Sequence, residues 1–440
     1  MSSNQVRASR AIAVATTVVL AATAFGASAA SAAAKTKRAS VKNNGAQSNG
    51  EVKFTPAISG NGRFVVFRSD ATNLVSNDTN GLDDLFVRDL KKGKTRRISI
   101  GTGGVETDAF STQASISDNG RFVVFRSNAT NIGGGSSGLI ADIFLHDRKK
   151  KRTRLISKSN AGVASNSDSF EPKISGDGRY VTYYTIATTI VPNDSNGSQN
   201  DVMVYDRLKK KTTRASKSSK GVQGPLSSSL SDISADGRFV VWDSKSENLV
   251  GSDSNGFGDI FIRDRKKKKT RLISVRSDGG QSNGNSARAT VSANGRFVAF
   301  QSDATNLVDG DDNDTRDVFV HDRKKKKTRR VSVSTKGVEG DFGSNTPSIS
   351  NDGRFIAFNS SARNLVNGDS NNSGDVFVRD RVKKKTRRVG LRQNGGQIPF
   401  GATNVAISGD GRFVSFTTKS NLGSKDTNDK TDAFRRGPLR

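Results

Sequence analysis

The chain has 440 residues, 32% of them hydrophobic, no cysteine and a net charge of +29. The lack of cysteine excludes a fold held together by disulfides, and the strong positive charge predicts anionic partners. The apolar residues gather in short runs rich in β-branched and aromatic side chains, which excludes a disordered chain.

Residues 1–34 have the composition of a secretory signal peptide. Arg7 and Arg10 precede an apolar run that starts at Ala11, and small residues continue to Ala34. We expect cleavage among the alanines up to Ala34 and a secreted product, extracellular or associated with the cell wall. No later apolar run reaches the length of a membrane span, so residues 35–440 are expected to form one domain without such a span.

A Gly-Arg-aromatic triplet recurs seven times, at intervals of 58 or 59 residues. Self-similarity at a fixed period indicates one supersecondary unit that is copied and stacked on its neighbours. The glycines of the triplets are Gly62, Gly120, Gly178, Gly237, Gly295, Gly353 and Gly411.

The first copy predicts four strands, at residues 56–59, 63–68, 85–89 and 95–100. Asn61 and Gly62 between the first two strands are typical of a tight hairpin turn. The inner strands are apolar on both faces and the last one alternates, as expected for a sheet packed between two similar sheets. The sequence therefore predicts an all-β fold, a β-propeller of seven four-stranded antiparallel blades. An open β-solenoid is the alternative, but it would need end caps, which we do not find in the sequence.

The two ends of the chain predict how the ring closes. The seventh copy reaches its third strand at residues 432–434 and has no fourth, whereas residues 35–40 match residues 211–216 of an earlier fourth strand. We therefore expect Thr36 to Val41 to pair with the last blade. This pairing would cover a sheet edge that otherwise invites aggregation.

The pattern Ile-Ser-x-Asp-Gly-Arg-Phe-Val-x-Phe, followed by Asp-Val-Phe-Val-x-Asp-Arg, appears in the copies that begin at Ile174, Ile233, Ile349 and Ile407. It resembles the WD40-like (PD40) repeat of TolB-type β-propellers. The resemblance implies the propeller fold and a secreted bacterial protein, but one such fold serves many functions.

Oxygen-bearing side chains alternate in the loop after the second strand of most copies, as they do in calcium-binding loops. The fifth copy is the richest, so we expect calcium there first. The alternative is ordinary turn chemistry, in which these side chains bond their own backbone. Asp142 persists in the second copy without the rest of the motif, which favours a structural role for the last aspartate. The candidate ligands are Asp309, Asp311, Asn313 and Asp317, then Asp78, Asn80 and Asp84, and Asp253, Asn255 and Asp259.

Lysines crowd the turn between the third and fourth strands, and a propeller would place all of these turns on one face, opposite the aspartate loops. Such a ring predicts binding of an anionic cell-wall polymer or a protein partner, and nucleic acid without sequence specificity. The alternative is a set of solvated turns that resist aggregation. The clusters are Lys91 and Lys92, Lys149 to Lys151, Lys209 to Lys211, Lys266 to Lys269, Lys324 to Lys327, and Lys383 to Lys385.

An arginine begins each second strand and an aspartate ends the third strand of six copies, so ion pairs within each blade are expected. The arginines are Arg63, Arg121, Arg179, Arg238, Arg296, Arg354 and Arg412; the aspartates are Asp89, Asp147, Asp206, Asp264, Asp322 and Asp380, with Gly437 in the seventh copy.

A ligand site in a symmetric ring is expected where the copies differ. The first strands would line the central channel, and their mixed polar side chains favour a polar ligand over the paired acids of a glycosidase. The alternative is neutral variation in a water-filled channel. The variable positions are Gln113, Glu171, Lys173, Asp232, Arg288 and Asn404.

Catalysis has little support in the sequence. The only histidines, His146 and His321, stand where other copies have Arg88 and Arg379, which indicates repeat variants rather than catalytic bases. We therefore predict a monomeric, non-catalytic binding scaffold that calcium could stabilise. The alternative is an exported hydrolase or lyase with its site in the channel.

Overall fold

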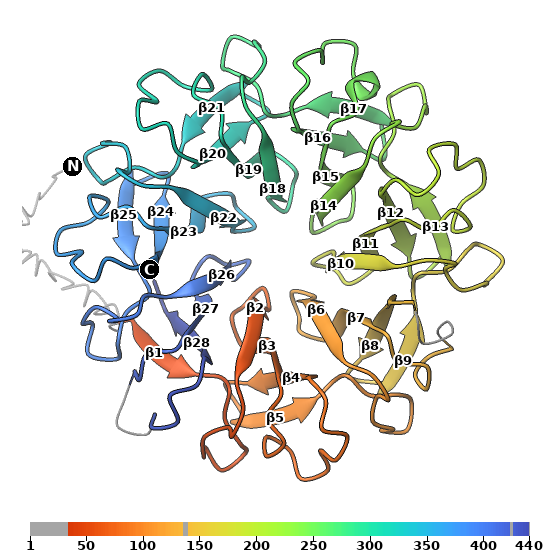
Figure 1. Cartoon of the computed structure of the whole chain (residues 1–440), viewed down its shortest axis with the longest axis vertical. Helices are drawn as coiled ribbons and strands as arrows, with labels where there is room; N and C mark the ends of the chain where they lie inside the picture. Colours follow the sequence, from red (N-terminus) through yellow and green to blue (C-terminus); the bar gives the residue numbers. More distant parts are fainter. Residues whose placement is uncertain (1–33, 135–139, 423–425, 440) are drawn as a thin grey trace, which may run out of the picture. The chain divides into compact units, whose positions relative to one another are not determined.

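The computed structural model describes residues 34–134, 140–422 and 426–439; the predicted signal peptide, apart from Ala34, lies outside the described residues. The described chain forms seven four-stranded antiparallel sheets in a ring, which confirms the predicted propeller (Figure 1). Blades 1 to 6 follow chain order from β2–β5 to β22–β25, and blade 7 combines β26–β28 with β1. The one helix among the described residues is the short 3-10 helix η1 (Glu247–Leu249).

The first strand of each blade lies nearest the centre of the ring (Figure 1). These strands begin before the predicted ones because a β-bulge extends them. They are β2 (Val52–Ile58), β6 (Ser111–Ile116), β10 (Ser169–Ile174), β14 (Ser228–Ile233), β18 (Ser286–Val291), β22 (Ser344–Ile349) and β26 (Thr403–Ile407).

The second and third strands of each blade carry most of the core. The second strands are β3 (Phe64–Ser69), β7 (Phe122–Ser127), β11 (Tyr180–Thr185), β15 (Phe239–Ser244), β19 (Phe297–Ser302), β23 (Phe355–Ser360) and β27 (Val414–Thr418). The third strands are β4 (Asp84–Asp89), β8 (Asp142–Asp147), β12 (Asp201–Asp206), β16 (Asp259–Asp264), β20 (Asp317–Asp322), β24 (Asp375–Asp380) and β28 (Asp432–Gly437).

The outermost strands are short and end where the chain turns back toward the next blade. In blade 1 the strand stops at Arg97, earlier than predicted, because Ile100 forms a separate bridge with Glu106. These strands are β5 (Lys94–Arg97), β9 (Arg152–Leu155), β13 (Lys211–Arg214), β17 (Lys269–Leu272), β21 (Lys327–Arg330), β25 (Lys385–Arg388) and β1 (Lys35–Arg38).

The predicted closure is confirmed. Strand β1 pairs antiparallel with β28, with Thr36 opposite Arg436, and the Ala39 amide donates to the Ala433 carbonyl at 2.7 Å. The Ser40 hydroxyl donates to Asp432, just as Ser99 donates to Asp84 in blade 1. The first described strand therefore reproduces the contacts of an ordinary outermost strand.

The Gly-Arg-aromatic triplet is the joint between blades. Gly237 lies against the ring of Tyr180 in the preceding blade, so closely that a Cβ at Gly237 would meet the ring Cδ2 at 2.0 Å. The Arg265 guanidinium lies 4.4 Å from the centre of the same ring and donates to the Gly237 carbonyl at 2.5 Å. Only glycine leaves room for this aromatic contact, which explains why the triplet recurs.

At the joint between blades 7 and 1 a different arginine takes this role. Leu90 occupies the position that Arg265 has in blade 4. The guanidinium comes instead from Arg435 of β28, which lies 4.3 Å from the Phe413 ring centre and donates to the Gly62 carbonyl at 2.8 Å. The joint is therefore complete although its arginine belongs to the other blade.

The predicted ion pairs within the blades are confirmed in blades 1 to 6. In blade 1, Arg63 holds Asp89 through two hydrogen bonds of 2.8 and 2.6 Å. Asp89 also accepts from the amides of Lys91 and Lys92, and it therefore fixes the turn that follows. The other pairs are Arg121–Asp147, Arg179–Asp206, Arg238–Asp264, Arg296–Asp322 and Arg354–Asp380.

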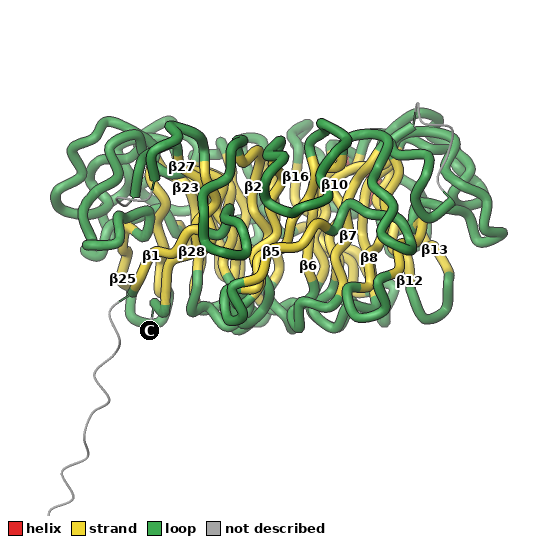
Figure 2. The backbone as a smooth tube through the Cα atoms, turned by 90° about the horizontal axis from the view of Figure 1, so that it is seen from below, coloured by secondary structure: helices red, strands yellow, loops and turns green. Residues whose placement is uncertain are grey.

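Alternating strand direction sorts the loops onto two faces (Figure 2). The turns after the first and third strands lie on one face, and the loops after the second and fourth strands lie on the other. Among the described residues there is no helix with the length and apolarity needed to cross a membrane.

Candidate functional site

Each innermost strand has a β-bulge at which one residue adopts a left-handed backbone conformation. In β6 the pairing with β7 shifts between Thr112 and Ser115, and each of the other innermost strands has a corresponding shift. Positive φ is rare outside glycine, costs about 1–3 kcal/mol, and concentrates at functional sites. The residues of this bulge ring, with φ from 46° to 62°, are Phe54, Gln113, Glu171, Leu230, Arg288, Thr346 and Asn404.

Four of the six predicted channel residues belong to the bulge ring. Gln113 donates to Glu171 Oε1 at 3.3 Å, and its own Oε1 accepts from the Glu171 amide at 3.1 Å. Asn404 donates to the Thr417 hydroxyl at 2.9 Å, and Arg288 is exposed. The sequence analysis missed Phe54, Leu230 and Thr346. Leu230 and Thr346 stand seven residues before their triplet glycine, as Gln113 does, whereas Phe54 stands eight residues before Gly62.

Lys173 and Asp232 lie two residues beyond the bulge residues of their strands. Asp232 Oδ2 accepts from the Val291 amide of the next blade at 2.9 Å. The Ser115 and Ser348 hydroxyls make the equivalent contact elsewhere. Burial raises the pKa of Asp232, while the charge of Lys173 acts to lower it. Asp232 thus joins two blades through its side chain.

Aromatic side chains and arginines stand beside the bulge ring in blades 1 to 3. The Arg68 guanidinium lies 5.0 Å from the ring centre of Phe54 and 5.6 Å from that of Phe110. Phe54 is 59% exposed and Phe110 40% exposed. In blade 3, Phe170 stacks on Tyr184 with ring centres 5.2 Å apart. Exposed aromatic faces with nearby polar groups are suited to ligand binding.

The predicted lysine turns are exposed and share the face that carries the turns after the first strands. We call them the lysine rim. The centre of the same face is acidic, because a cavity of about 540 Å³ there is lined by the turns that hold Asp118, Asp352 and Asp410. Burial raises the pKa of Asp118. An anionic partner on this face is therefore expected to contact the rim and avoid the centre.

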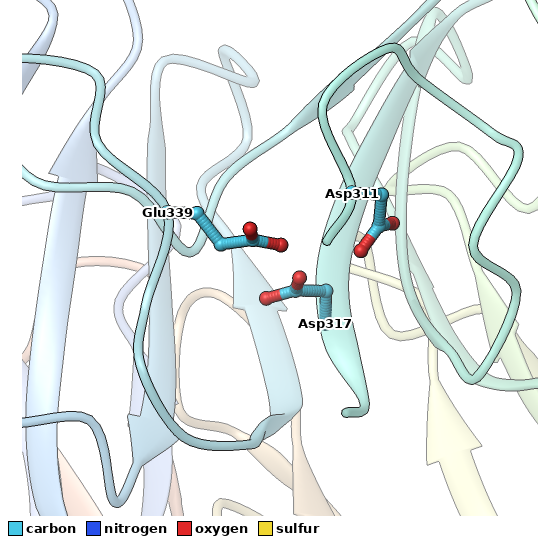
Figure 3. A group of neighbouring side chains, drawn as sticks. All are labelled: Asp311, Asp317 and Glu339. Carbon is cyan, nitrogen blue, oxygen red and sulfur yellow. The ribbon is translucent and has the colours of Figure 1, made fainter. Parts of the chain in front are cut away.

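In blade 5, the residues predicted to bind calcium surround an arginine. Figure 3 shows Asp311, Asp317 and Glu339, whose carboxylate oxygens lie within 4.8 Å of one another. Arg330 is 3.7 Å from Asp311 Oδ1 and 3.5 Å from Asp317 Oδ2, and it also pairs with Glu339. Asp309 is exposed and lies outside this group. The sequence analysis considered neither Arg330 nor Glu339.

Blade 1 has the same arrangement. Arg97 lies 3.2 Å from Asp78 and 3.1 Å from Asp84, and it also pairs with Glu106. Burial and the negative charge of Asp84 raise the pKa of Asp78 to about 6 although Arg97 acts to lower it. The guanidinium thus stands where the sequence predicted a cation from solution.

The asparagines of these loops make the contacts of the turn alternative. Asn80, Asn255 and Asn313 each accept, through Oδ1, from the amide two residues later. Their side-chain amides donate to carbonyls of the following connection, and Asn255 also donates to Asp259 Oδ2 at 2.9 Å. Within each predicted set of calcium ligands, the aspartates are therefore stronger candidates than the asparagines.

Both histidines are buried in the blade core. His146 lies 3.0 Å from the Thr153 hydroxyl, and His321 lies 2.9 Å from that of Thr328. Burial and a neighbouring arginine lower the pKa of each histidine from 6.5 to about 4. The buried rings are thus neutral members of the blade core, as expected for repeat variants.

The described chain is thus a seven-bladed β-propeller whose innermost strands carry the bulge ring. No known family model matches the chain, and no curated protein matches its sequence. Solved structures do match. The β-propeller domain of the Trilobed protease from Pyrococcus furiosus aligns with a TM-score of 0.53 and 12% identity, over 89% of this chain and 94% of that one.

Two further structures illustrate the range of similar proteins. Oligogalacturonate lyase from Vibrio parahaemolyticus has a TM-score of 0.52 and 10% identity, covering 88% of this chain and 90% of that one. A putative TolB from Agrobacterium tumefaciens has a TM-score of 0.42 and 14% identity, covering 78% of this chain and 94% of that one. TolB propellers are thus among the structures similar to this chain. At such identities the similarity shows the propeller fold alone.

Proposed function

We propose that the chain is an exported, non-catalytic scaffold that binds an anionic polymer of the cell wall. The observation that carries this proposal is the lysine rim, six clusters of exposed lysines on one face of the ring, in a chain whose net charge is +29. Binding of a polyanion to such a rim releases counterions and needs no precise fit. Export is inferred from the composition of residues 1–34.

Salt dependence tests this proposal. Beads that carry a polyglycerol phosphate, as in teichoic acid, should retain the protein at low salt and release it at high salt. Substituting Lys267, Lys268, Lys325 and Lys326 by glutamine should weaken retention and flatten its salt dependence. DNA beads should behave alike, because the rim recognises charge rather than sequence.

A matched variant controls for net charge. Lys158, Lys220, Lys245 and Lys336 lie in loops on the opposite face, and their replacement by glutamine removes the same charge. Equal loss of retention in both variants would contradict a rim-specific contact. Retention from isolated cell wall that is insensitive to salt would indicate a protein partner instead.

A second candidate function, recognition of a polar ligand at the centre, is supported by the bulge ring. The innermost strand of each of the seven blades carries one strained position, and the residue type at this position differs from blade to blade. Arg288→Ala and Phe54→Ala should each weaken binding of an oligosaccharide by about tenfold or more, with little effect on retention by polyglycerol phosphate. An oligosaccharide that is cleaved by the wild-type protein would favour the hydrolase or lyase alternative.

A further inference from the structure

Five blades contain an arginine between two aspartates, with only 6–12% of its side chain exposed. We call the two acids the loop aspartate and the strand aspartate, which begins the third strand. The guanidinium lies 3.0 to 3.7 Å from the loop aspartate and 3.1 to 3.5 Å from the strand aspartate. The arginine is always the last residue of the outermost strand, namely Arg97, Arg214, Arg330, Arg388 and Arg38.

The second blade has lost the arginine and the loop aspartate together. Leu155 ends β9, and the loop before Asp142 contains glycines and serines but no acid. Asp142 remains and accepts a hydrogen bond from the Ser157 hydroxyl at 2.6 Å. Blade 2 has therefore lost one acid together with the arginine and keeps a single carboxylate at this place.

The fourth blade has lost only the arginine. Leu272 ends β17, yet Asp253 and Asp259 are both retained. Asp253 is 8% exposed, and its Oδ1 is inaccessible to solvent and has no hydrogen-bond partner among the described residues. In blades 1, 3, 5 and 6 this same Oδ1 atom of the loop aspartate faces the guanidinium. The loop aspartate of blade 4 therefore has an unpartnered oxygen at the atom that faces the guanidinium in those four blades.

The neighbouring groups do not supply a replacement charge. Asp259 is fully buried; its Oδ1 accepts from Ser274 and Ser282, and its Oδ2 accepts from Asn255. Gln281 directs its amide to the Ser252 carbonyl. Burial, the charge of Asp259 and then that of Glu247 raise the pKa of Asp253 to about 6, so Glu247 adds negative charge here.

We propose that blade 4 binds a calcium ion in the position that the guanidinium occupies in five other blades. The ligands would be Asp253 Oδ1, the Asp259 carboxylate and the Ser252 carbonyl oxygen. The carbonyl before the loop aspartate accepts from the arginine in blades 1, 3, 5 and 6, so it already belongs to the cation environment there. A set of carboxylate and carbonyl oxygens selects a hard cation, and its irregular arrangement favours calcium over magnesium. This inference is independent of the polymer-binding proposal.

Terbium luminescence gives a local readout, because terbium replaces calcium at oxygen sites and is sensitised by a nearby indole. The only tryptophan of the chain, Trp242, lies on β15 two residues from Ser244, which pairs with Asp259. We expect saturable terbium emission that calcium displaces at lower concentration than magnesium. Excess calcium should also raise the Tm of the full chain by a few degrees relative to chelator.

Two variants test whether blade 4 binds calcium at this position. Leu272→Arg supplies the missing guanidinium and should abolish terbium emission and the calcium-dependent Tm shift, while keeping Tm in chelator at or above the wild-type value. Asp253→Asn removes one ligand and should also abolish emission. Leu155→Arg in blade 2 is the control and should leave emission unchanged.

Emission that survives in Leu272→Arg would overturn the proposal. So would a Tm that calcium does not raise in the wild-type protein. If Asp253→Asn stabilises the protein and calcium has no effect on the wild type, a proton rather than a metal neutralises Asp253, and the proposal is wrong.

Discussion

Asp118 of blade 2 accepts a hydrogen bond of 3.0 Å from the Asn351 side-chain amide of blade 6, across the centre of the ring. The turns around this pair are joined by their backbones, since the Asp118 amide donates to the Gly176 carbonyl and the Asn351 amide to the Gly409 carbonyl. The innermost turns thus hold one another on the face that carries the lysine rim.

A double-mutant cycle should measure the Asp118–Asn351 contact. Hydrogen bonds to a charged group contribute about 1.5–3 kcal/mol, so we expect a coupling free energy of about 1–2 kcal/mol between Asp118→Ala and Asn351→Ala. Urea unfolding of the four proteins gives this value. Additive effects of the two substitutions would contradict a direct contact.

The aromatic contact at the blade joints predicts that adding a single methyl group to the triplet glycine strongly lowers the free energy of unfolding. Gly237→Ala places a Cβ 2.0 Å from Tyr180 Cδ2 and at a φ of +69°. We expect a loss of about 3 kcal/mol or more in the free energy of unfolding, from overpacking added to backbone strain. Gly256→Ala is the control, because φ is +72° but no atom lies within 4 Å, and it should cost only about 1 kcal/mol.

Arg435 takes the role of the arginine that is missing at Leu90, so an arginine introduced at position 90 should compensate for the loss of Arg435. Arg435→Leu should lower the free energy of unfolding by about 2 kcal/mol, because the Gly62 carbonyl and the Phe413 ring lose their cation. Adding Leu90→Arg restores an arginine at the usual position and should recover part of the loss in chemical denaturation. Strictly additive losses in the double variant would show that the two positions are not equivalent.

Removing the closing strand should destabilise the whole ring. A chain that starts at residue 42 lacks β1 and leaves the edge of β28 unpaired, whereas one that starts at residue 34 keeps it. We expect the shorter chain to have a lower Tm and to aggregate at an exposed strand edge, as measured by calorimetry and size-exclusion chromatography. Equal Tm values for the two chains would contradict closure.

The buried histidines predict loss of stability in acid. Their pKa is lowered from 6.5 to about 4 in the folded protein, so the unfolded chain binds more protons between these values. Their contribution is complete above about pH 6.5 and falls on acidification, by about 2 kcal/mol per histidine at about pH 5.

Substituting both histidines isolates this effect. His146→Gln with His321→Gln should lose less stability than the wild type between about pH 7 and about pH 5, as measured by urea unfolding. Buried carboxylates with a raised pKa, such as Asp201, act in the opposite direction in both proteins and cancel in the difference. Parallel pH profiles would show that the histidines do not titrate in this range.

Much of this architecture is contained in the local pattern of the chain. The repeat period, the four strands of each copy, the pairs such as Arg63 with Asp89 and the closure by an N-terminal strand follow from spacing and alternation, because these features recur within one copy or match between copies. The closing strand was expected at Thr36 to Val41 and lies at Lys35–Arg38. The lysine rim follows as well, since the position of a turn in the repeat decides its face.

Contacts between groups that the repeat does not place side by side were decided only by the tertiary structure. The sequence shows that blade 4 has Leu272 where blade 5 has Arg330. The consequence of this change is clear only from the structure, which places Arg330 among Asp311, Asp317 and Glu339. The same holds for Arg435 in place of Leu90, for the strained φ of Phe54, and for Asp118 meeting Asn351. Such contacts depend on the distance and direction of side chains across the ring, and the spacing of the repeats in the sequence specifies neither.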